Sequence, residues 1–496
     1  MRKGLRKTGV LRLQHWASAQ RARFASSTPR RVRGMHDNIT PQAVLRRSII
    51  EKSFRNAAEG YAFQEVETPI VEDTSLFLRT LGDASDVVGK EMYTFLDRSK
   101  ASLSLRPEGT AGVMRAALDE EKQSGSGSGF GPQQPPRKLF YKGPMFRHER
   151  PQKGRYRQFT QLGVEYIGGA ADHPLADAEV IALANDFLED IGIADECTLR
   201  INTLGTAQCR ERYQHELLKW LQALDPDTIS ESSKQKMADG RILRILDSKE
   251  DDFIVQNAPV IEDYLQPEAR ERHDSLLQLL DESGIPYQQD WTLVRGLDYY
   301  CHTAFEFVYE PREATTSEGS TQSLGAAQGT VLAGGRYDSL SSFLGWRGRG
   351  TNDVPAVGWA AGMERLELIL PQSVQDQRSP PPVVTVGFIR TAGCATVHDD
   401  TETMKMFHTL CSSVQKQQQE MSAVSDAPQF RLHRHYAAGK MPQLLRACEG
   451  VGSQVLLLAG VDELAQGLVS VRDLRTREQT TVSVADAVDH LRRLLT

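Results

Sequence analysis

The alternation of apolar and polar residues predicts a helix followed by several strands in the first part of the chain. The helix begins at Thr40-Pro41, because Thr can cap a helix and Pro suits its first position, and it ends at Gly60. Its apolar residues recur at roughly helical spacing, at Val44, Leu45, Ile49, Ile50 and Phe54. Strand-like runs follow, including 138–148 and 156–167.

These two runs predict antiparallel strands joined by a turn at Pro151–Gly154. Side chains alternate between the two faces of a strand. One face carries Arg147, Glu149, Arg155, Arg157, Phe159, Gln161 and Glu165. The other face carries Thr160, Leu162, Val164 and Tyr166, a set that suits packing on a core. The polar face can bind a polyphosphate, stack on a base and hold an amine, but a solvated hairpin explains the periodicity equally well.

Three other segments before Pro371 differ from this pattern. The segment 210–285 is polar, charged and mostly helical in pattern, and it predicts an inserted helical subdomain. The stretches 123–136 and 311–329 are of low complexity, and both predict surface loops.

A proline-rich stretch, 371–382, predicts a linker between two domains. Beyond it, buried strands at 383–389 and 455–459 alternate with helical segments, the last of them at 485–495. That alternation predicts a small α/β domain over 383–496. The length of the chain, 496 residues, also exceeds what one hydrophobic core usually spans.

The segment 1–33 forms a basic leader. It contains ten Lys and Arg, and the first acidic residue of the chain is Asp37. Its Ser- and Ala-rich composition, with a short apolar helix face, predicts a mitochondrial transit peptide and a matrix location. The alternative is a disordered basic arm that touches nucleic acid. A start at Met35 would give a cytosolic form.

Without the leader, 49 basic residues face 65 acidic ones, a net charge of −16. A protein this acidic binds nucleic acid only through local basic patches. The six cysteines show no metal-like spacing, so we expect free thiols in a reducing compartment and no metal site. No apolar run is long enough to form a membrane-spanning helix, so we expect no membrane span.

Segments spread along the chain resemble, in order, the motifs of class II aminoacyl-tRNA synthetases in their bacterial histidyl form. The segment 63–69 is similar to motif 1, 105–112 to the amino-acid-binding loop, 146–166 to motif 2, 293–300 and 332–338 to the two histidyl signatures, and 358–366 to motif 3. The resemblance runs from about Gly34 to the C-terminus. Two departures are Ser339, where Gly is usual, and Trp359, which replaces a usual Phe in motif 3.

The resemblance implies an α+β catalytic core over 34–370, in which helices flank an antiparallel sheet, and a C-terminal anticodon-binding domain. It implies ligation of L-histidine to tRNA(His) through a histidyl-adenylate. ATP is then a substrate that brings Mg²⁺ with it, and no metal is tightly ligated by the protein. It also implies a homodimer, since motif 1, with Pro69, lies at the dimer interface in this class.

By the same resemblance, ATP is bound by Arg147, Glu149, Arg155, Phe159 and Arg365. Arg147 and Arg295 are the catalytic pair that holds the α-phosphate from two sides, because a guanidinium can fork onto phosphate and carboxylate oxygens. Arg155 and Arg365 hold the γ-phosphate, and Phe159 stacks on adenine. For Arg295, a structural ion pair with Asp298 is the alternative.

Histidine is bound, by the same resemblance, by Glu108, Gly109, Thr110, Arg147, Gln161, Glu165, Arg295, Tyr299 and Tyr300. Glu108, Thr110 and Gln161 lie at its ammonium group. A neutral imidazole has one donor and one acceptor nitrogen, so Glu165 can accept from the first and Tyr300 can donate to the second. A site of this kind rejects apolar isosteres, because they leave its buried polar groups unpaired.

The resemblance gives the remaining residues weaker roles. Gln152 is similar to residues that approach the acceptor end of the tRNA. Gly334 and Gly335 would let a strand approach the substrate closely. Tyr337 and Asp338 are expected to be local packing. No side chain is assigned as the general base, because an oxygen of the adenylate can take the proton from the ribose hydroxyl.

Two other functions compete with this one, and a purely structural RNA-binding protein is a distant third, because the adenylate-site residues would have no purpose there. The first is a catalytically inactive, regulatory relative, although such proteins tend to lose motif residues, and this chain keeps Arg147, Arg295 and Arg365. The second is a class II synthetase for threonine, proline or glycine, against which the two histidyl signatures argue.

Overall fold

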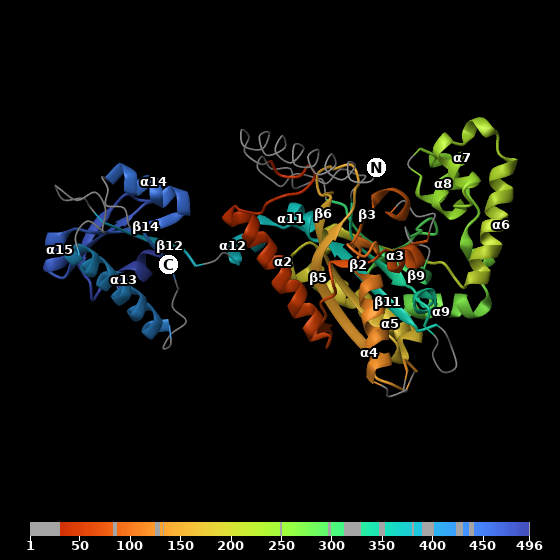
Figure 1. The fold of residues 1–496 in the computed structure, drawn as a ribbon, viewed down its shortest axis with the longest axis horizontal. Helices are drawn as coiled ribbons and strands as arrows, with labels where there is room; N and C mark the ends of the chain where they lie inside the picture. The colour runs from red at the N-terminus through yellow and green to blue at the C-terminus, as the bar shows by residue number, and fades with distance from the viewer. Residues whose placement is uncertain are drawn as a thin grey trace, which may run out of the picture. The chain divides into compact units, whose positions relative to one another are not determined.

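The computed structural model describes residues 30–82, 87–124, 129–131, 133–248, 250–295, 299–311, 329–346, 353–378, 381–388, 401–422, 430–435 and 441–495. The chain divides into two compact units, 1–378 and 379–496 (Figure 1). None of the helices described is long and apolar enough to cross a bilayer.

The first unit is built on a mixed, mainly antiparallel sheet of eight strands. In spatial order they are β1 (Gln64–Glu65), β5 (Arg137–Phe146), β6 (Gln158–Ile167), β11 (Ala356–Gly362), β10 (Thr330–Arg336), β9 (Cys301–Tyr309), β7 (Cys197–Thr203) and β8 (Tyr287–Gln289). Only the outer pairs β1–β5 and β7–β8 of this sheet are parallel. A small second sheet has the order β2 (Val71–Asp73), β4 (Ser102–Leu105) and β3 (Tyr93–Leu96).

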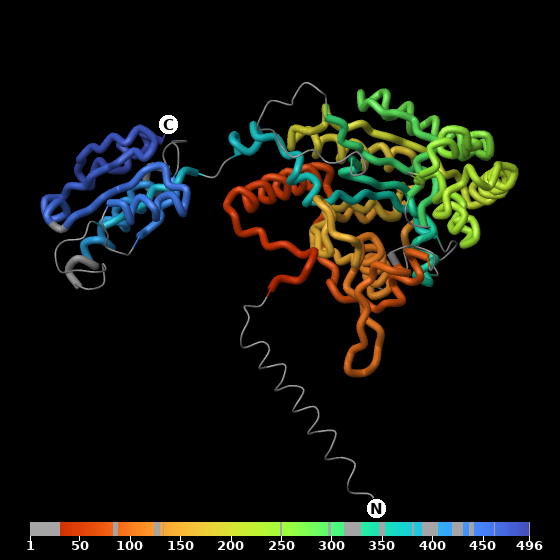
Figure 2. Tube along the Cα trace, turned by 90° about the horizontal axis from the view of Figure 1, so that it is seen from above, coloured from red at the N-terminus to blue at the C-terminus, as the bar shows by residue number. Residues whose placement is uncertain are grey.

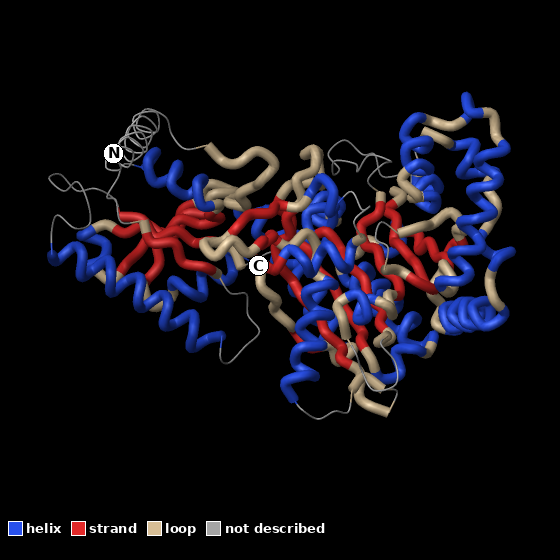
Figure 3. The backbone as a smooth tube through the Cα atoms, turned by 45° about the vertical axis from the view of Figure 1, so that its right-hand side comes forward, coloured by secondary structure: helices blue, strands red, loops and turns tan. Residues whose placement is uncertain are grey.

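Helices cover both faces of the large sheet (Figure 3). The first apolar core joins the sheet to α2 (Pro41–Gly60), α5 (Pro174–Asp190), α9 (Pro267–Glu282) and α11 (Met363–Ile369). The second core joins it to α3 (Thr74–Leu81), α4 (Thr110–Ser124) and α10 (Leu340–Phe343). Single turns lie at Val87–Glu91, Gly169–Asp172 and Ala194–Glu196.

The sequence predicted α2 and the β5–β6 hairpin. The Thr40 hydroxyl accepts a hydrogen bond from the Ala43 amide, 3.2 Å away, and the helix begins at Pro41, as expected. In the hairpin, Leu162 and Val164 point into the first core, whereas Gln161 and Glu165 face the opposite side, toward the loop that begins α4. The alternation of side chains therefore assigned these two faces correctly.

The helical insertion lies between β7 and β8, at the end of the unit opposite α2 (Figures 1 and 2). It contains α6 (Ala207–Ala223), α7 (Glu231–Ala238) and α8 (Asp252–Asn257), with short 3₁₀ turns at Pro226–Thr228, Ile242–Asp247 and Ile261–Tyr264. These elements share a small core of their own. The insertion begins slightly earlier than predicted, at Ala207, and α9, expected within it, packs on α5 through Leu276 and Leu280.

The predicted linker is shorter than 371–382. Its first part forms α12 (Gln372–Gln377), where the Gln375 side chain donates to the Leu370 carbonyl at 3.0 Å. Arg378 then pairs with Asp190 of α5 at 2.8 Å. Proline is tolerated at a helix start, and Pro371 precedes a helix here. That helix belongs to the first unit.

The second unit is an α/β domain, as predicted. Its sheet has the order β13 (Arg431–Arg434), β12 (Val383–Phe388), β14 (Ser453–Ala459), β15 (Leu468–Asp473) and β16 (Gln479–Ser483). Its described helices are α13 (Thr401–Ser422), α14 (Met441–Val451), α15 (Val461–Ala465) and α16 (Ala487–Leu495). The buried strands β12 and β14 and the final helix match the sequence prediction.

The two departures from the family pattern have simple local explanations. Ser339 has φ −78° and ψ −4°, an ordinary helical conformation that needs no glycine. The larger ring of Trp359 fits between α2 and α5, where its indole N–H donates to the Val180 carbonyl at 2.9 Å. A buried indole needs such a partner.

Some predictions fall on residues that are not described. The leader is described only from Arg30 onward, and the insert 311–329 only at its ends. Five of the six cysteines are free thiols, as expected, and Cys394 lies outside the described residues.

Candidate active site

All five residues expected to bind ATP line one pocket on the sheet. Its volume is about 160 Å³, and β6, β10, β11 and the β5–β6 loop form its walls. The five are Arg147, Glu149, Arg155, Phe159 and Arg365. Motifs 2 and 3 are remote from each other in the sequence, and the antiparallel pairing of β6 with β11 brings them together.

The pocket gathers positive charge around an aromatic ring. The Arg147 guanidinium lies 5.3 Å from the centre of the Phe159 ring, and its Nε donates to the Pro107 carbonyl at 2.9 Å. Arg155 Nε is 3.5 Å from a carboxylate oxygen of Glu149. Burial and then the charge of Arg155 lower the pKa of Arg365. Such a cluster suits a polyanion, which would relieve this repulsion.

A buried carboxylate, Glu165, lies on the same strand as Phe159. Its Oε1 accepts from the Thr110 hydroxyl at 2.7 Å, and its Oε2 accepts from the Tyr337 hydroxyl. Burial raises the pKa of Glu165 to about 8. Gly358 on β11 leaves room for this group, since a Cβ there would come within 2.1 Å of Glu165 Oε2.

The loop before α4 is tied to the strand that carries Glu165. Glu108 caps α4, accepting from the amides of Thr110 at 2.7 Å and Ala111 at 2.9 Å. Gln161 Oε1 accepts from the Gly109 amide at 3.1 Å. The expected ammonium acceptors are thus brought together, but the Thr110 hydroxyl donates to Glu165 instead of standing free for the substrate.

Three tyrosine rings form the next part of the site. The ring of Tyr299 is centred 4.8 Å from Tyr300 and 5.7 Å from Tyr337. Burial, then Tyr300, Glu108 and Glu165, raise the pKa of Tyr299. Both expected histidine-binding tyrosines therefore lie in the surroundings of the two buried carboxylates.

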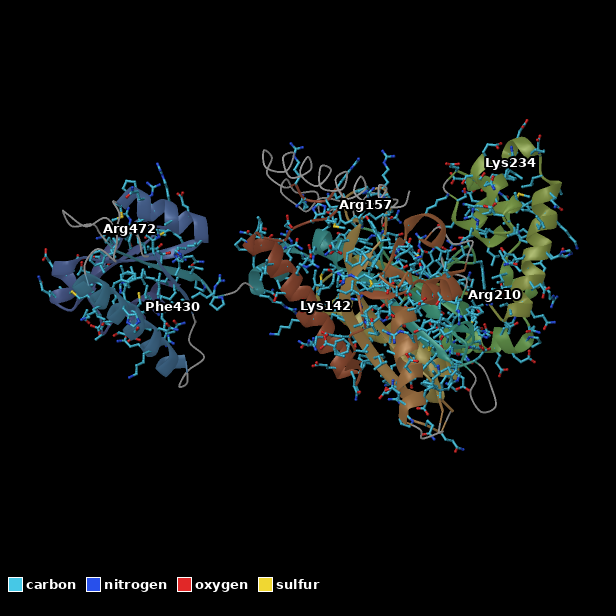
Figure 4. All side chains as sticks on the ribbon, in the orientation of Figure 1. Lys142, Arg157, Arg210, Lys234, Phe430 and Arg472 are labelled. Carbon is cyan, nitrogen blue, oxygen red and sulfur yellow. The ribbon has the colours of Figure 1, made fainter. Side chains whose placement is uncertain are left out.

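Arg295 is not among the residues that line the pocket containing Arg147. It borders a second cavity, of about 260 Å³, together with Arg210 and Arg241 of the insertion, the former labelled in Figure 4. Its Nη1 is 3.8 Å from Glu306 Oε2, and its guanidinium lies 5.4 Å from the Tyr300 ring centre. The alternative partner, Asp298, lies outside the described residues.

Arg295 is nevertheless connected to the first pocket. The Thr330 hydroxyl, at that pocket's wall, donates to Glu306 Oε2 at 3.1 Å, and the Arg365 guanidinium donates to the Thr330 carbonyl. Glu306 thus stands between Arg295 and the cations of the first pocket. The sequence pattern gave no sign of it, because a single glutamate on a strand is an ordinary surface residue.

The residues of the second histidyl signature contact other parts of the site and the sheet. Tyr337, expected to be local packing, contacts Glu165 directly, since a buried phenol needs a hydrogen-bond partner. A Cβ on Gly334 would lie 2.3 Å from the Gly358 carbonyl oxygen, and one on Gly335 would lie 2.5 Å from the Thr303 carbonyl oxygen. The close approach at these glycines is therefore to neighbouring strands.

Tyr141, which the sequence prediction missed, is a further buried side chain beside Glu108 and Glu165. Cβ atoms on Gly109 and Gly163 would come within 2.2 and 2.4 Å of its ring. Two glycines facing one aromatic ring are visible only once the strands are paired. Gln152, by contrast, lies exposed in the β5–β6 loop, where its backbone pairs with that of Arg155, as the weak tRNA assignment requires.

The antiparallel sheet, the arginine-rich pocket on its motif 2 hairpin and the separate α/β domain define a class II aminoacyl-tRNA synthetase. Within that class, the chain belongs to the histidyl-tRNA synthetase family, whose model matches residues 34–366. An anticodon binding domain model matches residues 397–494.

Similar proteins agree with this assignment. A histidine–tRNA ligase of Rhodospirillum rubrum is 40% identical over 467 residues, which are 94% of this chain and 99% of the relative. The apo histidyl-tRNA synthetase of S. aureus superposes with a TM-score of 0.65 at 27% identity, covering 94% of this chain and 100% of that one.

A third solved structure shows how far the fold alone reaches. A protein of Bacillus halodurans, described as an ATP phosphoribosyltransferase regulatory subunit/histidyl-tRNA synthetase, has a TM-score of 0.56 at 19% identity over 88% of this chain and 99% of its own. At that identity the likeness concerns only the fold. The residues of the site must therefore distinguish a synthetase from a regulatory protein.

Proposed function

We propose that this chain ligates L-histidine to tRNA(His), using ATP to form a histidyl-adenylate. The observation that carries the proposal is the pocket lined by all five residues expected to bind ATP. One of them, Phe159, lies on the same strand, β6, as the buried Glu165. The 40% identity to a histidine–tRNA ligase over nearly the whole of both chains supports the same activity.

In the activation step, a carboxylate oxygen of histidine bonds to the α-phosphorus, and the bond from that phosphorus to the bridging oxygen of pyrophosphate breaks. Arg147 is placed to neutralise charge on the α-phosphate and the carboxylate. Phe159 offers its face to adenine, while Arg155 and Arg365 bind the γ-phosphate. Glu149 would offer an oxygen ligand to the Mg²⁺ carried in with ATP, and that ion would supply charge neutralisation at the phosphates.

Arg295 acts from the other side of the α-phosphate. In the structure it is 3.8 Å from Glu306, so it must leave or share that carboxylate when ATP binds. In the transfer step, the terminal ribose hydroxyl of the tRNA attacks the carbonyl carbon, AMP leaves, and an adenylate oxygen takes the proton.

The inactive, regulatory alternative requires a site that does not complete the chemistry. In that case the site would keep its arginines, Glu165 and three tyrosines without a reaction that needs all of them. Transfer of labelled histidine to tRNA(His) by the protein without residues 1–33 tests the choice. Labelled tRNA supports the ligase, and its absence with folded protein supports the regulatory protein.

A homodimer and mitochondrial import belong to the same proposal. Ile70 and Val71, directly after Pro69 of motif 1, are 42% and 40% exposed, and apolar residues so placed suit a two-fold interface. Sedimentation should give a dimer, and an active monomer would contradict it. Fused to a fluorescent reporter, residues 1–33 should direct it to mitochondria; a diffuse signal would favour the basic arm.

A further inference from the structure

Tyr337, in the second histidyl signature, is a buried tyrosine whose hydroxyl contacts a predicted substrate-binding carboxylate. Its side chain is 1% exposed, and its hydroxyl donates to Glu165 Oε2. Its backbone amide donates to the Ala356 carbonyl at 2.9 Å. The phenol is therefore held by the sheet at its backbone and by Glu165 at its hydroxyl.

The residues on both sides of Tyr337 lock this position. Arg336 is fully buried and pairs with Asp177 of α5 and, at 2.9 Å, with Asp338. Asp338 in turn accepts from the Ala356 amide at 2.9 Å. A buried, hydrogen-bonded ion pair of this kind has one good arrangement, so it fixes the backbone that carries the phenol.

Hydrogen bonds stabilise the ionised form of Glu165 against its burial. The groups that face it are Thr110 and Glu108 at the start of α4, Tyr141 on β5, Tyr299 and Tyr300 before β9, and Tyr337 after β10. None of these groups is a cation. The hydroxyls of Thr110 and Tyr337 donate to one oxygen each, and Oε2 lies so close to Gly358 that a Cβ there would come within 2.1 Å of it.

We propose that Tyr337 is a positioning residue for histidine selection: its hydroxyl holds the Glu165 carboxyl group aimed so that it accepts from the imidazole N–H. This inference rests on the proposed function. Without the phenol, Glu165 takes up a proton more readily, and its O–H then presents a donor where the substrate needs an acceptor.

The test is Tyr337→Phe in histidine-dependent ATP–pyrophosphate exchange, measured from about pH 6 to about pH 9. Loss of a hydrogen bond to a charged group should raise the KM for histidine about tenfold or more while the KM for ATP stays nearly unchanged. The acidic limb of kcat/KM for histidine should move to higher pH. Tyr213→Phe, which also removes a buried phenol, bonded 2.8 Å from the Pro259 carbonyl in the insertion, should change neither.

A second variant keeps the test valid if the cavity left by Phe unfolds the protein. A ring-fluorinated tyrosine at position 337 has nearly the same shape but a more acidic, stronger donating hydroxyl, so it should move the acidic limb to lower pH. An acidic limb that stays at the same pH in every variant that folds would overturn the proposal. A parent protein without histidine-dependent exchange would instead overturn the proposed function.

Discussion

Arg295 lies outside the pocket in which the sequence predicted it. It lies by Glu306 and the Tyr300 ring, beside the cavity toward the insertion. A permanent cation near the phosphate pocket remains the group that can stabilise transition-state charge from the second side.

We predict that Arg295→His abolishes histidine activation with the fold intact. The change replaces a permanent charge with one that is largely neutral near pH 7, and the exchange rate should fall about 100-fold or more. Arg137→His is the matched control, because Arg137 lies on the same sheet, pairs with Glu120 and lines neither of the two cavities. A loss below about tenfold would remove Arg295 from catalysis.

Glu165 makes the stability of the protein sensitive to pH. Its pKa in the folded protein, about 8, lies above the ordinary 4.5, so between these values the unfolded chain has lost a proton that the folded one keeps. Stability therefore falls as pH rises through this window. Glu165→Gln, which resembles the neutral form, should flatten this decline by up to a few kcal/mol.

The measurement is the Tm of the parent and the variant without ligands, from about pH 5 to about pH 8. The same variant should also be strongly impaired in histidine activation. Glu310→Gln is the control, because hydrogen bonds from Thr198 and Arg200 lower the pKa of Glu310, so this group is ionised in both states over the whole range and its loss should leave the slope unchanged. Parallel Tm curves for Glu165→Gln and the parent would show that Glu165 titrates normally.

For single residues, the sequence predicted the position of those side chains that follow a local pattern. Phe159 and Glu165 were assigned to the correct face because side chains alternate along a strand. Tyr337 and Tyr141 were not assigned, because their contacts with Glu165 and with Gly109 exist only after the strands have paired. Glu306 was missed for the same reason.

The elements differ in how far local signals define them. The start of α2 could be predicted because its cap, Thr40, and its first residue, Pro41, are adjacent in sequence. The sequence assigned α9 to the helical insertion and α12 to the linker. In the structure α9 packs on α5, and Arg378, directly after α12, pairs with Asp190; both contacts are remote in sequence.

The segment before α2 stabilises the motif 2 loop. The Arg157 amide donates to the Gly34 carbonyl at 2.7 Å, and the His36 ring is centred 3.9 Å from that of Tyr156. Gly34 has φ +84°, and a Cβ there would lie 2.8 Å from the Pro151 side chain. The loop that carries Arg155 thus depends on the residues directly after the leader.

We therefore predict that protein lacking residues 1–33 is fully active, whereas protein lacking 1–39 loses about tenfold or more of its exchange rate through a higher KM for ATP. Gly34→Ala in the longer form should show a weaker effect of the same kind, because its backbone conformation is strained for alanine. Equal kinetics for both truncations would show that the segment does not support the loop.

At the scale of the whole molecule, we expect histidine activation and anticodon recognition to lie in separate units. Every residue assigned to adenylate formation lies between Glu108 and Arg365, inside the first compact unit. The second unit has its own core and matches an anticodon binding domain. Two such units should fold semi-independently.

We predict that a chain ending at Arg378 retains measurable ATP–pyrophosphate exchange and aminoacylates tRNA far more weakly. The cut keeps α12 and its Arg378–Asp190 pair. The mass of the truncated protein in solution must be measured as well, because a weakened dimer would lower exchange indirectly. A truncated dimer that charges tRNA as well as the full chain would exclude the second unit from tRNA binding.

The most direct test of the central claim is amino-acid-dependent ATP–pyrophosphate exchange by the protein without residues 1–33. Histidine, threonine, proline and glycine should be supplied one at a time, with Arg147→Ala as the inactive control. The site described here predicts exchange with histidine alone, because only an imidazole satisfies the buried Glu165 and its tyrosines. Folded protein that shows no exchange with histidine, or shows it with another of these amino acids, would contradict the account.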